Sequence, residues 1–169
     1  MYLKGHGVER DNTQARGWFR AAALQDDVVS LSQLGLMQLI GKAGLLADSK
    51  AAKTLLERAA AQGDADAQFN LAVLFEEGRG VTQEAPAAAR YYALAAAQGH
   101  LAAQTNLGLL YIEGRGVKRN LATAYQWIEA AASRGYAKAS YALGVMEAEG
   151  LIARGPSTDS IESTDPDRG

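Results

Sequence analysis

The chain contains 169 residues, among them 34 alanines and 18 glycines, and its formal net charge is −2. The chain is not collagen, because glycine does not recur at every third position and there are only three prolines. It is not disordered throughout, because 48% of its residues are hydrophobic. The lack of cysteine excludes disulfides, thiolate metal sites and a cysteine nucleophile.

We expect a soluble, cytoplasmic protein. Residues 1–5 lack the apolar core of a secretion signal, and no apolar run approaches the roughly 20 residues that a membrane helix needs. The small net charge gives no general attraction to nucleic acid or to an anionic membrane. A longer native chain with an upstream signal sequence would reverse this expectation.

The sequence repeats itself at intervals of 36 or 37 residues. Residues 107–117 (LGLLYIEGRGV) closely match residues 71–81 (LAVLFEEGRGV), and the alanine-rich segments that end at Gly63, Gly99 and Gly135 are also 36 apart. One extra residue between Gly41 and Gly44 accounts for the offset of 37. A period between about 20 and 50 residues is typical of stacked helical or propeller repeats.

The first unit, residues 1–26, is a truncated repeat. It begins just before a Gly-x-Gly loop and continues into one helix that carries Trp18 and Phe19. We expect these aromatic side chains to lack part of a helical partner. Either the chain is a fragment of a longer array, or this open end docks on another molecule, such as a second copy.

Three fuller repeats follow, at 27–63, 64–99 and 100–135. Each contains a first helix, a glycine-rich loop, a second helix and a tight turn, with apolar residues at helical spacing. Asp11, Asp48 and Asn120 are predicted to cap the second helices, Glu84 is a poorer cap, and Pro86 suits a first helical turn. Residues 136–154 are predicted to form a C-terminal capping helix, and residues 155–169 a disordered acidic tail.

Small residues recur at fixed positions of the repeat. Gly35, Gly108 and Gly144 share one position of the first helix, although a glycine within a helix costs about 1 kcal/mol relative to alanine. We therefore predict that the second helix crosses the first too closely there for a larger side chain.

Residues 103–135 carry a pattern that resembles the Sel-1-like repeat, a relative of the tetratricopeptide repeat. The matching residues are Ala103, Leu107, Gly108, Tyr111, Gly114, Gly116, Val117, Asn120, Ala124, Trp127, Ala131, Ala132 and Gly135. The resemblance covers about residues 1–150. It implies an all-α fold, a right-handed α-solenoid of antiparallel helix hairpins whose concave face is lined by the first helices. It also implies a role as an adaptor or scaffold for a protein or peptide partner.

The candidate partner-binding residues are positions of the first helices that should point away from the second helices. They are Phe69, Asn70, Val73, Glu76, Glu77, Thr105, Asn106, Leu109, Ile112, Glu113, Lys138, Tyr141 and Val145. Asn70 and Asn106 occupy the same repeat position. Their side chains either hydrogen-bond the backbone of a partner or stabilise the local fold. Phe69 and Tyr141 share another phase and are either binding anchors or packing residues between repeats.

No catalytic residues, metal ligands or cofactor are predicted, and we expect no enzyme activity. The sequence lacks His-Glu-x-x-His, Gly-x-Ser-x-Gly and Ser-x-x-Lys, while His6 and His100 fall at loops where solvated side chains are expected. Arg79 and Arg115 could attract an anion, but the turn needs their glycine neighbours in any case. Two alternative functions remain: a hydrolase like the β-lactamases described among Cys-rich relatives, and an RNA-binding repeat, for which the basic stripe is missing.

Overall fold

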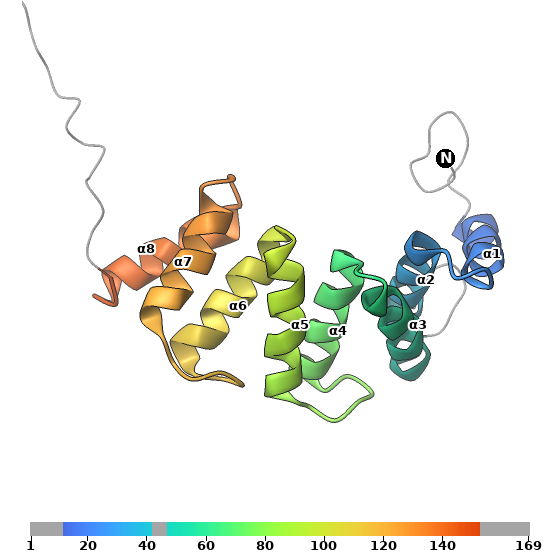
Figure 1. The fold of residues 1–169 in the computed structure, drawn as a ribbon, viewed down its shortest axis with the longest axis horizontal. Coiled ribbons are helices and arrows are strands. Elements are labelled where there is room, and N and C mark those ends of the chain that lie inside the picture. Colours follow the sequence, from blue (N-terminus) through green and yellow to red (C-terminus); the bar gives the residue numbers. More distant parts are fainter. Residues whose placement is uncertain (1–11, 42–46, 153–169) are drawn as a thin grey trace, which may run out of the picture.

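The computed structural model describes residues 12–41 and 47–152, and these form a row of helices (Figure 1). The Gly5 and Gly7 loop, the cap at Asp11, His6, the insertion before Gly44 and the acidic tail lie outside the described residues. The eight helices of the described part are α1 (Asn12–Ala23), α2 (Val28–Ile40), α3 (Ser49–Ala61), α4 (Ala65–Glu77), α5 (Ala85–Ala97), α6 (Leu101–Glu113), α7 (Leu121–Ala132) and α8 (Ala137–Ala148). The predicted all-helical solenoid is confirmed.

Successive helices pack as hairpins, and the hairpins stack on one another. The pairs α2–α3, α4–α5 and α6–α7 form the repeats, while α3–α4, α5–α6 and α7–α8 join them. Contacts also link α2 to α4 and α6 to α8, which brings first helices of neighbouring repeats together on one side of the row. Any surface between two first helices therefore belongs to two repeats at once.

The second helices begin at the predicted caps. A carboxylate oxygen of Asp48 accepts hydrogen bonds of 3.0 Å from the backbone N–H groups of Lys50 and Ala51. The side chain of Asn120 caps α7 in the same way, whereas Glu84 makes no side-chain cap and Pro86 stands in the first turn of α5. The cap predictions for these described helices are confirmed.

One backbone hydrogen bond closes the glycine-rich loop in every described repeat. The N–H of the cap residue donates to a carbonyl near the end of the preceding first helix, each time at 2.9 Å. The pairs are Asp48 to Gln38, Glu84 to Phe75 and Asn120 to Tyr111. Gly78 and Gly114 start these loops with φ of 66° and 71°, a left-handed conformation that favours glycine.

The close helix crossing is present at two of its three predicted positions. A methyl group added at Gly108 would lie 2.4 Å from Cγ1 of Ile128, and one at Gly35 would lie 2.8 Å from Cγ of Leu56. The prediction is wrong at Gly144, where an added methyl group would meet no described atom outside its own helix within 4 Å. The reason is that no second helix covers α8 in the described part of the chain.

Glutamine side chains join one repeat to the next. The amide nitrogen of Gln68 on α4 donates to the carbonyl of Ala60 on α3 at 3.3 Å, and that of Gln104 on α6 donates to Ala96 on α5 at 3.2 Å. Both glutamines are buried, so these bonds hold each first helix against the end of the preceding second helix.

Candidate protein-interaction groove

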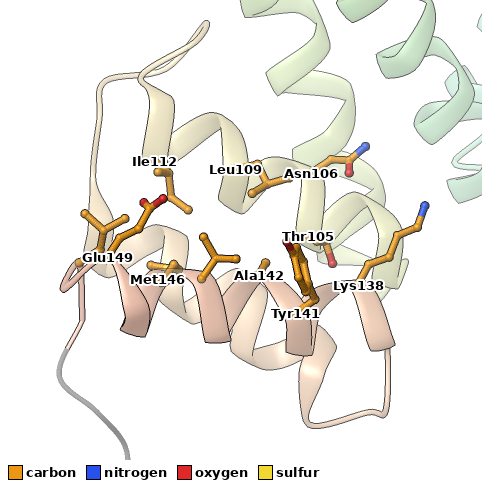
Figure 2. A pocket seen from close by; sticks show the side chains of 11 residues that line it. Thr105, Asn106, Leu109, Ile112, Lys138, Tyr141, Ala142, Met146 and Glu149 are labelled. Atoms are coloured by element: carbon orange, nitrogen blue, oxygen red, sulfur yellow. The ribbon is translucent and has the colours of Figure 1, made fainter.

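A groove of about 330 Å³ lies between α6 and α8 (Figure 2). Its lining residues come from both helices and from the segment just after α8. They are Thr105, Asn106, Leu109, Ile112, Lys138, Tyr141, Ala142, Val145, Met146, Glu149 and Leu151. The groove exists because α6 and α8, the first helices of adjacent repeats, contact each other directly.

The groove brings together seven of the thirteen residues that the sequence predicted for partner binding. These are Thr105, Asn106, Leu109, Ile112, Lys138, Tyr141 and Val145. Met146 was missed because its repeat position is core in the other first helices, as Leu110 shows. Ala142 and Glu149 were missed although they share the repeat positions of the candidates Asn106 and Glu113. Leu151 follows the last recognisable repeat position, so periodicity gave no signal for it.

The groove has an apolar floor and an exposed aromatic rim. Met146 is buried at its base, whereas Tyr141 is 76% exposed and Leu109 is 37% exposed. Lys138 lies at one end and Glu149 at the other, as Figure 2 shows. An apolar cleft with a few polar groups at its margins is the usual form of a binding site.

Two polar residues of the groove wall already have partners within the protein. Thr105 is buried, and its hydroxyl donates to the carbonyl of Leu101 at 3.0 Å within α6. The Asn106 amide donates to the hydroxyl of Tyr92 on α5 at 3.0 Å. Asn106 therefore serves the local fold, one of the two roles that its phase predicted.

Asn70 differs from Asn106 because its repeat lacks the matching tyrosine. Leu56 occupies the position of Tyr92 one repeat earlier, and it offers no hydroxyl to an amide. Within the described residues the side chain of Asn70 makes no hydrogen bond. The asparagine at this repeat position is thus bonded to the fold in one repeat, whereas in the other its side chain makes no hydrogen bond among the described residues.

The remaining predicted residues on α4 lie outside the groove. Phe69 stacks on His100 with ring centroids 4.5 Å apart and packs near Tyr92, while Val73 packs against the same core. Phe69 is thus a packing residue between repeats. His100 is not a freely solvated side chain, because its Nδ1 accepts from the backbone of Ala103 at 3.1 Å and caps α6.

Three predicted acidic residues are held in ion pairs. Glu76 accepts from Tyr92 at 2.6 Å and from Arg115 at 2.8 Å, so it faces α5 and the next repeat. The prediction that Glu76 points away from the second helix of its hairpin is therefore wrong. Glu113 pairs with Arg115, and Glu77 pairs with Arg79 at 3.4 Å.

The loop arginines bind protein groups. The hydrogen bond to Glu113, and further ones to Glu76, raise the pKa of Arg115. Arg79 reaches the carbonyl of Leu39 in the preceding repeat at 3.4 Å. Both arginines therefore connect consecutive repeats, and the turn rather than an anion accounts for their position.

Neither a metal site nor a membrane span is found in the part of the chain that the structure describes. No group of three His, Cys, Asp or Glu side chains there could hold a metal ion. None of the eight helices is long and apolar enough to cross a membrane.

Comparison with known families assigns the chain to a class of repeat protein. The Sel1 repeat model matches residues 1–27, 28–64, 65–100 and 101–136, and the chain belongs to the Sel1 repeat family. Sel1 repeats commonly form protein-interaction scaffolds and are in general not catalytic. No curated protein sequence matches the chain significantly.

Solved structures of Sel1 repeat proteins are similar to this chain over most of its length. A protective antigen present in uropathogenic Escherichia coli strains, which displays an SLR fold, is 36% identical with a TM-score of 0.82; the match covers 88% of this chain and 32% of the antigen. A Sel1 repeat protein from Oxalobacter formigenes is 34% identical with a TM-score of 0.80, covering 89% of this chain and 61% of that protein. This chain therefore spans about a third and about three fifths of their lengths.

A third structure shares the fold alone. The cysteine rich protein B of Helicobacter pylori is 20% identical, with a TM-score of 0.61 over 83% of this chain and 98% of that protein. The present chain has no cysteine, so it holds the same arrangement of helices without disulfides.

Proposed function

We propose that this protein is an adaptor that binds a partner protein or peptide in the groove between α6 and α8. The observation that carries the proposal is the apolar groove itself, built from first helices of two repeats and bordered by the exposed side chains of Tyr141 and Leu109. Large aromatic and apolar side chains at such a site are typical anchors for a partner.

A non-catalytic role agrees with the groove's chemistry. Its polar side-chain atoms belong to Thr105 and Asn106, which are engaged in the fold, to the Tyr141 hydroxyl, and to two charged residues at its ends. Binding therefore requires only shape, apolar burial and charge. Turnover of nitrocefin by the purified protein would instead favour the hydrolase alternative, and a gel shift with RNA at low salt would favour the nucleic-acid alternative.

Affinity capture with matched variants tests the proposal. Tyr141→Ala with Leu109→Ala removes exposed groove side chains and should reduce capture of partner proteins from the source cell, with little change in melting temperature. Tyr125→Ala with Leu94→Ala removes the same two types of exposed side chain from α7 and α5, outside the groove, and should leave capture unchanged. Equal capture by both double variants would contradict the proposed site.

Self-association is a second candidate function, favoured by two uncovered surfaces. Trp18 on α1 is 68% exposed beside Phe19, and no helix in the described part of the chain covers Gly144 on α8. Phe19 shares the repeat position of Ile128, which covers Gly108. The α1 helix of one copy, laid on α8 of another, would therefore reproduce the α6–α7 crossing.

Light scattering over a range of concentrations tests this second candidate. We expect the average molecular mass to rise with protein concentration, and to rise less for the Trp18→Ala variant. A constant monomer mass at high concentration would rule it out.

A further inference from the structure

We propose that the α6–α8 groove selects an extended peptide segment that carries an acidic residue at one end and a basic residue at the other. An acidic residue of the segment would lie beside Lys138, large apolar side chains would fill the middle, and a basic residue would lie beside Glu149. This inference rests on the proposed function and names the chemistry of the partner.

Lys138 and Glu149 carry the charges at the two ends of the groove. Within the described residues neither Lys138 nor Glu149 takes part in an ion pair, although both border the groove (Figure 2). By contrast, Arg115 in the adjoining repeat is used internally, in its contacts with Glu76 and Glu113. In the described part of the chain, the groove thus presents a free cation at one end and a free anion at the other.

Both charges also oppose the dipole of α8. Lys138 is the second residue of the helix, where the backbone already carries a partial positive charge, and Glu149 is the C-terminal cap, where the charge is partially negative. Each position therefore disfavours the side chain that occupies it. The same placement strengthens the positive potential at one end of the groove and the negative potential at the other, which suits a ligand of the opposite polarity.

The separation of the charges fits a short extended segment. Lys138 and Glu149 are 11 positions apart along α8, or about 16 Å at 1.5 Å per residue. An extended peptide covers that length in about five residues at roughly 3.3 Å each. Leu109, Ile112 and Met146 line the space between them, so the intervening residues would be apolar on the side that faces the groove.

The groove's volume favours an extended segment over a helical one. At about 330 Å³ it lies near the small end of ligand sites. A helix with its side chains is about 10 Å across, too wide to enter such a space. Alternate side chains of an extended chain point to the same side, so two leucines at positions i and i+2 can enter together.

A defined peptide tests the inference without knowledge of the natural partner. The probe is fluorescein-labelled Glu-Ser-Leu-Ser-Leu-Ser-Lys with blocked ends, and its binding is followed by fluorescence anisotropy. We expect it to bind about tenfold more tightly than the same peptide with glutamine at both charged positions, since each exposed charge pair contributes up to a few-fold in affinity. The difference should shrink as salt is raised.

Charge reversal in the protein provides the matched variants. Lys138→Glu and Glu149→Lys should each weaken binding of the charged probe about tenfold and leave the neutral probe unchanged. Because a peptide can lie in either direction, the double reversal should recover most of the affinity. Glu129→Lys, which makes the same charge change on α7 outside the groove, should have no effect.

The outcomes separate this inference from the proposed function. Equal binding of charged and neutral probes, both abolished by Leu109→Asp, would overturn the charge selection and leave the groove as a binding site. Failure of both probes to bind at about 1 mM would overturn the charge selection. A Leu109→Asp variant that still captured cellular partners normally would overturn the groove proposal as well.

Discussion

The hydroxyl of Tyr92 on α5 donates a 2.6 Å hydrogen bond to Glu76 on α4, within one hairpin. Arg115, in the loop after α6, reaches the same carboxylate at 2.8 Å, and Asn106 on α6 donates to the Tyr92 hydroxyl at 3.0 Å. Tyr92 is fully buried, so its hydroxyl depends on these partners in place of water. The network fixes α6, and with it one wall of the groove, relative to the preceding hairpin.

Replacing Tyr92 with Phe should lower the free energy of unfolding by about 1–3 kcal/mol. The substitution removes the hydroxyl, so the partly buried side chains of Glu76 and Asn106 each lose one hydrogen-bond partner. The packing of the aromatic ring is retained. Urea unfolding followed by circular dichroism measures the change. Tyr91→Phe is the matched control, because the Tyr91 ring stacks on Phe75 and its hydroxyl makes no hydrogen bond among the described residues. Equal stability of the two variants would show that the network contributes nothing.

The same tyrosine should make the protein sensitive to high pH. Burial, and then the hydrogen bond to Glu76, raise the pKa of Tyr92 above its ordinary value of 10.0. Above that pH the unfolded chain releases the phenol proton while the folded protein keeps it. The contribution of the protonated Tyr92 to the free energy of unfolding is complete below pH 10. It is lost as the pH rises above that value, by up to about 1.4 kcal/mol per pH unit.

Comparison with Tyr92→Phe isolates this effect from the other titrating groups. Between about pH 9 and pH 11, the free energy of unfolding should fall more steeply with pH for the native chain than for the variant. Parallel pH profiles for the two proteins would contradict the assigned role of Tyr92.

Two glycines at the same repeat position should respond in opposite ways to alanine. Gly108→Ala places a methyl group against Ile128 and the carbonyl of Ala124, so we expect a loss of about 1–3 kcal/mol. Gly144→Ala meets no neighbour within 4 Å among the described residues outside α8 and should gain about 0.5–1 kcal/mol from helix propensity. Thermal unfolding of both variants checks this pair. If a second copy covers α8 in solution, Gly144→Ala should also reduce self-association.

Repetition explains why so much of the fold could be predicted from the sequence. A cap such as Asp48 or Asn120, seen at the same phase in successive units, identifies a helix start far more reliably than one residue alone. The glycine crossing was predicted correctly at Gly35 and Gly108 for the same reason. It failed at Gly144, because periodicity shows that a position recurs but not whether a neighbouring helix covers it.

The groove was only partly predictable, since it depends on departures from the repeat. Asn70 and Asn106 share a phase, yet only Asn106 has a tyrosine hydroxyl within reach. Glu76 was expected to point away from the second helix, but Tyr92 on that helix donates to it, and Arg115 of the next repeat pairs with it. Leu151 completes the groove from beyond the last repeat position, where the pattern provides no register.

The charges at the two ends of α8 lead to a further prediction about stability. Lys138→Glu and Glu149→Lys should each raise the free energy of unfolding by about 0.3–1 kcal/mol, because each replaces an unfavourable charge at a helix end with a favourable one. Lys138→Gln should give a smaller gain, and all three effects should diminish at high salt. Urea unfolding at low and high ionic strength measures them. Variants that are more stable but bind the charged peptide less well would show that α8 sacrifices stability for the groove's polarity. A loss of stability on charge reversal would instead mean that Lys138 and Glu149 support the fold through contacts within the chain.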